Sequence, residues 1–143
     1  MRKIGVCVGF INESFRRRIE AAARGFSVDF LGSEEELAAR IGEFEVVFGH
    51  PDPALLVRAV HLRWLCSDFA GVEKYLPDGV WPAPDCLLSN ASGAYGPAIS
   101  EHIVMVLLML MRRMPEYQAA LARREWPYFA PVRSIMGSRI VLL

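Results

Sequence analysis

The residues with which this chain could do chemistry gather in short polar turns, each placed directly after an apolar run of strand length. The turns are Gly49-His50-Pro51-Asp52, the segment from Ser67 to Glu73, and the segment from Asn90 to Tyr95. Ligands of parallel sheets bind beyond the carboxyl ends of the strands, so we expect these turns to lie at one edge of a sheet.

The turn from Ser67 to Glu73 offers the most specific chemistry. Its Ala70-Gly71 pair combines small side chains with an expected helix start at Gly71–Tyr75. Backbone N–H groups at such a helix start suit a small anion such as a carboxylate. The alternative interpretation is that Ala70-Gly71 is a plain tight turn between a strand and a helix.

The three histidines differ in placement, and only His50 follows an expected strand. His50 is therefore the one candidate to contact a ligand, whereas we expect His102 to pack or hydrogen-bond within a long apolar helix. His61 lies at a helix-to-strand corner and receives no role. The three cysteines are an odd number at wide spacing, which favours buried reduced thiols over a disulfide or a metal site; they are Cys7, Cys66 and Cys86.

The composition excludes several classes of function. Sixteen basic and sixteen acidic residues balance to a net charge of zero, so nothing favours nucleic acid or an acidic membrane surface as a partner. The longest apolar run, from Ile103 to Met111, is far shorter than the ~20 residues of a membrane span. The amino-terminal segment has the pattern of a strand, because no small-residue cleavage site of a signal peptide follows it. We expect a cytoplasmic protein.

Alternating strand and helix patterns must position the turns. Strands are expected over residues 3–10, 28–31, 45–48, 62–66 and 86–88, with helices between the first four. Asn12 and Ser33 are placed to cap the first two helices, and a short helix is expected over residues 53–60. Phe15 and Ile19 would form the apolar face of the first helix. Strands that alternate with helices require parallel crossovers, which predicts an α/β fold with a doubly wound parallel sheet buried on both faces.

The segment from Leu87 to Arg113 has the pattern of a boundary between two α/β domains. A cluster of turn residues leads into a helix from Pro97 to about Met114 that is apolar on nearly every face and that Pro115 is expected to stop. We place the boundary between residues 1–94 and residues 95–143. In the second part we expect a further helix and then a first strand over residues 137–143, which would be the truncated start of the second domain.

Residues 62–143 resemble the D-isomer-specific 2-hydroxyacid dehydrogenases in the order and spacing of their motifs. The resemblance rests on LRWLCSDFAGVEKYL, on LLSNASGAYGPAISEHIVMVLLMLMRRMPEY, and on a later tryptophan ahead of GSRIVLL. It implies a flavodoxin-like substrate domain, also called the catalytic domain, over residues 1–94. It also implies that residues 95–143 begin a Rossmann domain for NAD or NADP. Members of this family are oxidoreductases that transfer a hydride between the nicotinamide and a small 2-keto or 2-hydroxy acid.

Carried over by position, the resemblance assigns the substrate carboxylate to the backbone N–H groups of Ala70 and Gly71. It also places Tyr95 and the loop at His50 in the same cleft. The family's dinucleotide loop and its catalytic arginine, glutamate and histidine would lie beyond Leu143. We therefore expect no catalytic residue, no bound cofactor and no activity in this chain alone.

The sequence departs from the family pattern at two places. Asp68-Phe69 stand where small or uncharged residues are common, and Glu73 stands where the family often has aspartate. An acid and a large ring at these positions would repel or crowd part of an anionic substrate.

Two hypotheses of different classes follow. The first is a piece of such an oxidoreductase, and the second is a self-contained flavodoxin-like binding or interaction module without catalysis. A phosphoacceptor receiver domain is disfavoured, because Phe10-Ile11-Asn12 stand where its paired acids would follow the first strand. The helix from Pro97 to Met114 predicts a homodimer, since a helix that is apolar all round must be buried all round, and the resemblance implies pairing through this helix. The alternative is that residues 126–143 fold back over it as a lid.

Overall fold

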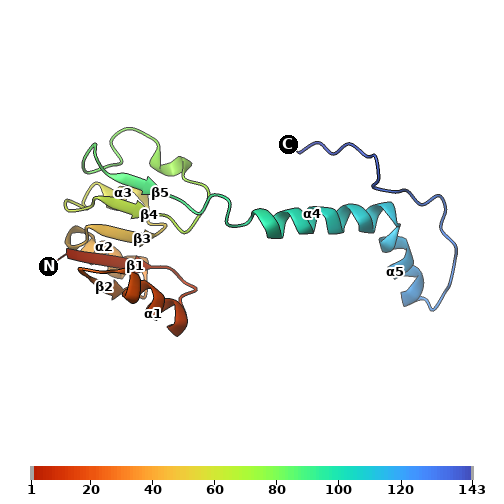
Figure 1. The fold of residues 1–143 in the computed structure, drawn as a ribbon, viewed down its shortest axis with the longest axis horizontal. Coiled ribbons are helices and arrows are strands. Elements are labelled where there is room, and N and C mark those ends of the chain that lie inside the picture. The colour runs from red at the N-terminus through yellow and green to blue at the C-terminus, as the bar shows by residue number, and fades with distance from the viewer. Residues whose placement is uncertain (1, 143) are drawn as a thin grey trace. The chain divides into compact units, whose positions relative to one another are not determined.

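The structure is a computed structural model that describes residues 2–142. The chain forms two compact units, Met1–Ala94 and Tyr95–Leu143. The first unit holds a parallel sheet with its helices, and the second consists of two helices followed by an irregular segment (Figure 1).

Five parallel strands make up the sheet of the first unit: β1 (Arg2–Cys7), β2 (Phe26–Phe30), β3 (Val46–Gly49), β4 (Trp64–Cys66) and β5 (Leu87–Ser89). Their order across the sheet is β2-β1-β3-β4-β5, and every neighbouring pair is parallel. This is the strand order of flavodoxin-like folds, in which the order reverses beside β1. The predicted α/β fold with a flavodoxin-like doubly wound parallel sheet is confirmed.

The helices of the first unit begin where the sequence places capping residues. The side chain of Asn12 accepts a hydrogen bond from the backbone N–H of Phe15 at 3.0 Å ahead of α1 (Glu13–Ala22). Ser33 accepts from the N–H of Glu36 at 3.3 Å ahead of α2 (Glu34–Arg40), which continues into the single 3₁₀ turn η1 (Ile41–Glu43). Each cap satisfies one of the donors that a helix start leaves without an intrahelical partner. The third helix, α3 (Pro53–Leu56), is shorter than the expected residues 53–60, because the chain turns after Leu56.

The hydrophobic core lies on the face of the sheet that α2 and α3 cover. Leu37 and Leu56 of these helices and Val47 and Leu65 of β3 and β4 are at most 1% exposed. The ring of Phe44 packs so closely on β1 that a Cβ added at Gly5 would lie 2.9 Å from it. Close packing of this kind fixes the distance between the sheet and the segment that carries α2.

The opposite face of the sheet is only partly covered. The aligned side chains of Trp64 and Leu87 are 41% and 65% exposed. Helix α1 contains no buried residue, and Phe15 on its expected apolar face is 43% exposed. The prediction that both faces of the sheet are buried is therefore wrong for the described residues of this unit. The reason is that α1 packs mainly beside β2 and no helix of the unit follows β5.

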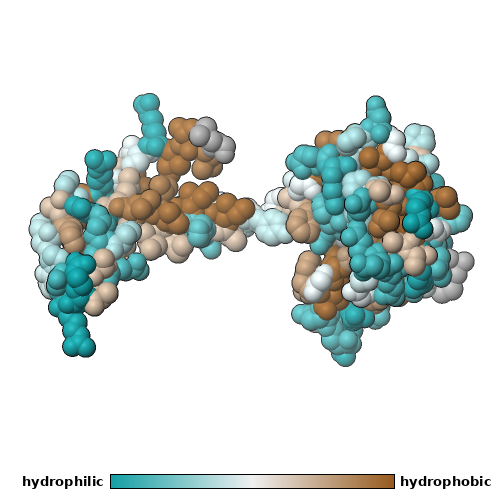
Figure 2. Space-filling view, turned by 180° about the vertical axis from the view of Figure 1, so that it is seen from behind, coloured by the Kyte–Doolittle hydropathy of each residue, from teal (hydrophilic) through white to brown (hydrophobic). Residues whose placement is uncertain are grey.

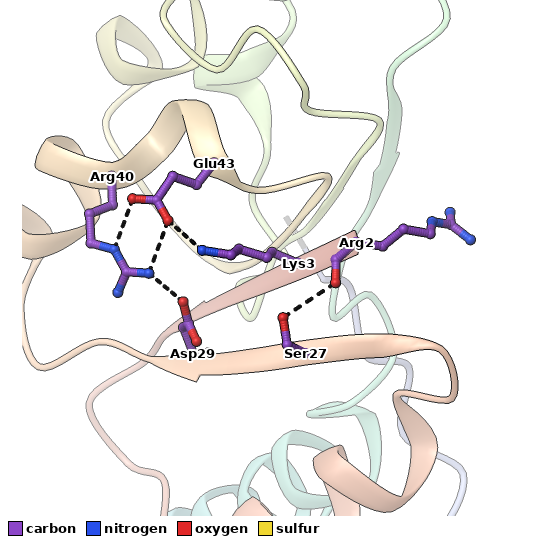
Figure 3. A network of polar contacts seen from close by, with 6 residues as sticks. All are labelled: Arg2, Lys3, Ser27, Asp29, Arg40 and Glu43. Atoms are coloured by element: carbon purple, nitrogen blue, oxygen red, sulfur yellow. Dashed lines mark hydrogen bonds and ion pairs between the residues drawn. The ribbon is translucent and has the colours of Figure 1, made fainter.

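A network of ion pairs joins β1, β2 and the end of α2 (Figure 3). The guanidinium of Arg40 pairs with Asp29 and, at 3.1 Å, with Glu43. Lys3 donates to the same Glu43 carboxylate at 2.7 Å. These bonds to cationic donors lower the pKa of Glu43 to about 2. These side chains keep between 29% and 42% of their surface exposed, so solvent screens the pairs and the network contributes modestly to stability.

The second unit begins with the long apolar helix. Helix α4 (Gly96–Met111) has Pro97 in its first turn, and helix α5 (Met114–Ala122) follows after Arg113, whose φ of 57° lies in the left-handed region. The expectation that Pro115 stops the first helix is wrong. Proline is tolerated in a first helical turn, where the missing N–H has no partner to lose, and Pro115 opens α5 in this way.

The segment after α5 contains neither helix nor strand. It returns to the junction of the two helices, where Arg113 donates to the carbonyl of Ala130 at 2.9 Å and the Tyr117 and Phe129 rings meet edge to face. The first strand expected over residues 137–143 is absent from residues 137–142, and Leu143 lies outside the described residues. A strand requires a hydrogen-bonded neighbour, and no described strand pairs with this segment.

Candidate functional site at the carboxyl edge of the sheet

Parallel strands end at a common edge, and this edge of the first unit carries the candidate site. A cavity of about 220 Å³ opens there. Its walls come from the end of β1, from the start of α2, and from the loops after β3 and β4; they include Cys7, Gly9, Glu34, His50, Asp68 and Phe69. The loops that the sequence singles out after β3 and β4 are thus brought together.

The backbone at the end of β3 directs His50 to this edge. Gly49 has a φ of 150°, and a Cβ at this position would collide with the carbonyl group of Cys7 on the neighbouring strand. Only glycine is accommodated at such a point without displacement of the backbone. The position of His50 therefore depends on Gly49.

His50 is held by side chains from two directions. Its Nδ1 atom lies 3.0 Å from the hydroxyl of Ser67, which is 3% exposed. Its ring packs on the ring of Phe69 with 4.5 Å between centroids and meets the edge of Tyr75 at 5.4 Å. The contact with Ser67 leaves Nε2 as the ring nitrogen that can bond a ligand.

The surroundings of His50 favour its neutral form. Burial lowers the pKa of His50 below its ordinary value, and the charge of Lys74, whose Nζ donates to the His50 carbonyl at 3.2 Å, lowers it further. Nearby carboxylates oppose this shift without reversing it. Near neutral pH the imidazole can therefore donate or accept a hydrogen bond but brings no positive charge to the cavity.

The cavity itself is electronegative. The Oδ1 atom of Asp68 is buried and has no hydrogen-bond partner among the described residues. The Glu34 carboxylate accepts a hydrogen bond from the backbone N–H of Asp52 at 2.6 Å. Burial, followed by the charges of Glu34, Glu36 and Asp68, raises the pKa of the Cys7 thiol. Cys7 is thus held as a thiol, and a thiol is a poor nucleophile.

Ala70 and Gly71 follow directly after the cavity wall, on an exposed turn. Asn90 tethers this turn by donating from its side-chain amide to the Ala70 carbonyl at 2.6 Å. The backbone N–H groups of Ala70 and Gly71 themselves donate no hydrogen bond within the described chain. Unbonded amides on an ordered turn are suited to an anionic ligand.

One expectation about this turn is wrong. No α-helix starts at Gly71; only the single 3₁₀ turn η2 (Glu73–Tyr75) follows. A three-residue turn brings almost no helix dipole, so attraction of an anion there rests on the individual amides. The Glu73 carboxylate also lies close, since a Cβ at Gly71 would be 3.0 Å from its Oε2 atom.

The remaining expected residues are placed as follows. Tyr95 immediately precedes α4 in the second unit and is 51% exposed, so its part in the site at His50 stays a prediction. Cys7, Cys66 and Cys86 are free but only half-buried. Sequence reasoning missed Ser67 as the partner of His50. The only feature of the sequence that could have indicated Ser67 is its position as the first polar residue after β4.

Some kinds of site are not found in the described part of the chain. No group of three or more His, Cys, Asp or Glu side chains within residues 2–142 is arranged to hold a metal ion. Among the described helices, none has both the length and the apolar character needed to cross a bilayer.

The chain is similar to solved structures of the family that its motifs predict. A D-isomer specific 2-hydroxyacid dehydrogenase family protein from Aeromonas salmonicida is 28% identical, with a TM-score of 0.75 over 93% of this chain and 43% of that chain. This finding confirms the resemblance. No protein-family model matches the chain.

Two further structures share the fold at lower identity. One is a D-isomer specific 2-hydroxyacid dehydrogenase family protein from Klebsiella pneumoniae, 21% identical, with a TM-score of 0.60 over 93% of this chain and 41% of that chain. The other is D-mandelate dehydrogenase from Rhodotorula graminis, 16% identical, with a TM-score of 0.64 over 87% of this chain and 41% of that chain. The chain therefore spans less than half the length of the structures that it matches.

Proposed function

We propose that this chain is the substrate-binding part of a D-isomer-specific 2-hydroxyacid dehydrogenase. In this oxidoreductase a hydride would pass between NAD or NADP and a small 2-keto or 2-hydroxy acid. The observation that carries the proposal is the pair of unbonded amides at Ala70 and Gly71, beside His50, in a fold similar to a member of that family. These amides would hold the carboxylate that every 2-keto acid carries.

The other site residues have supporting roles in this proposal. Ser67 and Phe69 orient the His50 ring, so that its Nε2 atom can bond an oxygen of the substrate. Asn90 fixes the turn on which the two amides stand. Tyr95 remains a proposed further contact of the substrate. None of these groups moves a hydride, so the described residues contribute binding and orientation.

A dinucleotide does not fit the site that these residues form. The cavity of about 220 Å³ is smaller than typical cofactor pockets of roughly 300–1,000 Å³. Its Glu34 and Asp68 carboxylates would repel a pyrophosphate, and no glycine-rich loop follows a described strand in the pattern that binds one. We propose that NAD or NADP is held elsewhere in the complete enzyme, and we assign no step through it to this chain.

The apolar helix supports a homodimer as the assembly. None of the residues of α4 is buried within the described chain, and apolar side chains line it (Figure 2). Exposed examples are Val104, Met105 and Leu110, at 45%, 48% and 61%. Each large apolar side chain left in water costs about 1.5–3 kcal/mol relative to burial, so pairing of two copies along α4 would be strongly favoured.

A second candidate is a self-contained binding or interaction module without any oxidoreductase role. The observation in its favour is that the first unit has its own fully buried core, including Leu37, Phe44 and Leu65. This second candidate does not predict binding of 2-keto acids at Ala70 and Gly71. Ligand binding at these residues therefore distinguishes the two candidates.

The test is an NMR titration of the ¹⁵N-labelled chain with pyruvate and glyoxylate. We expect saturable shifts of the Ala70 and Gly71 amide signals and of the His50 ring, and no such shifts with the corresponding amide, pyruvamide. Shifts with pyruvamide equal to those with pyruvate, or no shifts with either keto acid, would reject the proposed function.

A further inference from the structure

The charge of the cavity beside Ala70-Gly71 constrains which 2-keto acids can bind. Glu34 and Asp68 both contribute to its wall, and no lysine or arginine does. His50 completes the polar lining, and its lowered pKa keeps it neutral near pH 7. A second anionic group on a ligand would therefore meet two like charges in the wall. The nearby Lys74, which donates to the His50 carbonyl, is not part of this lining.

The carboxylate of Asp68, a residue of this wall, is short of hydrogen-bond donors. The Oδ1 atom of Asp68 is buried, yet none of the described residues donates to it. A carboxylate short of donors costs free energy, and a ligand can lower this cost by donating to the part of Asp68 that lines the cavity. A hydroxyl or ammonium group meets this requirement, and a carboxylate or phosphate group does not.

The wall adjoins the proposed carboxylate-binding turn. Asp68 and Phe69 line the cavity and directly precede Ala70. A small acid held at the Ala70 and Gly71 amides therefore has this cavity beside it. At about 220 Å³ the cavity has room for a short side chain and not for a long one.

We propose that Asp68 is a specificity-determining residue, which selects 2-keto acids whose short side chain ends in a hydrogen-bond donor and rejects those with a second carboxylate or a phosphate. This inference rests on the proposed function, because it takes the substrate carboxylate to lie at Ala70 and Gly71. Glu34 adds to the same rejection through its charge. Specificity of this kind arises from repulsion of the wrong ligand as much as from attraction of the right one.

The experiment compares hydroxypyruvate with its phosphorylated form, 3-phosphonooxypyruvate, and with oxaloacetate and pyruvate, by NMR titration of the 143-residue chain. We expect hydroxypyruvate to bind more tightly than pyruvate and at least about tenfold more tightly than oxaloacetate and 3-phosphonooxypyruvate, which carry a second anionic group. Asp68→Asn, which keeps the shape and removes the charge, should reduce the preference over these two acids about tenfold. Glu34→Gln should reduce this preference by a smaller factor. Asp78→Asn, on an exposed loop outside the cavity lining, is the control and should leave the preference unchanged.

The outcomes separate this inference from the proposed function. If all four acids bind with the same dissociation constant, Asp68 does not determine specificity, while the proposed function stands. If the preference is unchanged in Asp68→Asn, the inference is likewise overturned, whatever the result for Glu34→Gln. If no 2-keto acid binds, the proposed function fails, and the inference fails with it.

Discussion

The Nδ1 atom of His50 lies 3.0 Å from the Oγ atom of Ser67, so one side-chain contact joins the end of β3 to the end of β4. Ser67 also bonds the backbone of Phe69, on whose ring His50 packs. The orientation of the histidine and the course of the turn that leads to Ala70 therefore depend on the same hydroxyl.

Replacement of Ser67 by alanine should loosen both the orientation of the His50 ring and the turn that leads to Ala70. Loss of a buried hydroxyl with several partners is expected to lower the free energy of unfolding by about 1–2 kcal/mol, measured by urea denaturation. It should also remove the shift of the His50 ring on addition of pyruvate. The matched control is Ser92→Ala, because the Ser92 hydroxyl makes no hydrogen bond in the described structure. Equal stability of Ser67→Ala and Ser92→Ala would contradict this account.

The lowered pKa of His50 predicts a pH dependence of stability. Its ordinary pKa is 6.5, and burial lowers it in the folded chain. At a pH between the folded and the unfolded pKa of His50, the unfolded chain binds the proton more tightly than the folded chain. The contribution of neutral His50 to stability should therefore be fully present above pH 6.5 and be lost as the pH falls through the folded pKa. His50→Gln should remove this part of the pH profile. An NMR titration that places the pKa of His50 at or above 6.5 would refute the prediction.

The ion pairs of Glu43 predict a second pH dependence at lower pH. The pKa of Glu43 falls from 4.5 to about 2 in the folded chain, because Arg40 and Lys3 donate to its carboxylate. Its contribution to stability is present above pH 4.5 and should be lost as the pH falls towards 2. In the variant Glu43→Gln, the thermal melting temperature should depend less on pH between pH 4.5 and 2 than in the wild type. Glu20→Gln, on the exposed side of α1, should not change this dependence.

Replacement of Gly71 by valine should weaken 2-keto acid binding at least about tenfold. The backbone of Gly71 lies outside the left-handed region, so the residue is required for space and not for its φ. A Cβ would meet the Glu73 carboxylate at 3.0 Å and cover the adjacent amide. NMR titration with pyruvate measures the change, and circular dichroism verifies the fold. Gly96→Val, where a Cβ meets nothing within 4 Å, is the control, and equal binding by both variants would reduce Ala70-Gly71 to a plain turn.

The exposed helix α4 predicts that the chain is a dimer at roughly 10–100 μM, since leaving its apolar side chains in water would rival the stability of a small domain. Multi-angle light scattering should give twice the mass of 16.0 kDa. Leu108→Glu should produce monomers, whereas Val60→Glu, at an exposed apolar position in the first unit, should not. A wild-type monomer in which circular dichroism shows α4 to be folded would contradict the prediction.

Local signals in the sequence determined where helices and turns begin. The caps at Asn12 and Ser33 could be predicted because each involves a side chain and a backbone N–H three residues later. The alternation of strands and helices determined the α/β class, and the motifs of residues 62–143 determined the family resemblance. The error at Pro115 has a local origin too, since a proline that cannot lie inside one helix can open the next.

Only the tertiary structure decided which of these turns come together at the candidate site. The contact between His50 and Ser67 spans 17 residues and depends on β3 and β4 being neighbours in the sheet. The buried Oδ1 atom of Asp68 also follows from packing, because the sequence indicates an acid at that position but not the absence of a donor around it. Likewise, the β-prone residues 139–142 form no strand, since a strand requires a partner that local sequence cannot supply. Pairing between strands, burial and hydrogen bonding between distant residues are set by the whole fold, and no short stretch of sequence contains them.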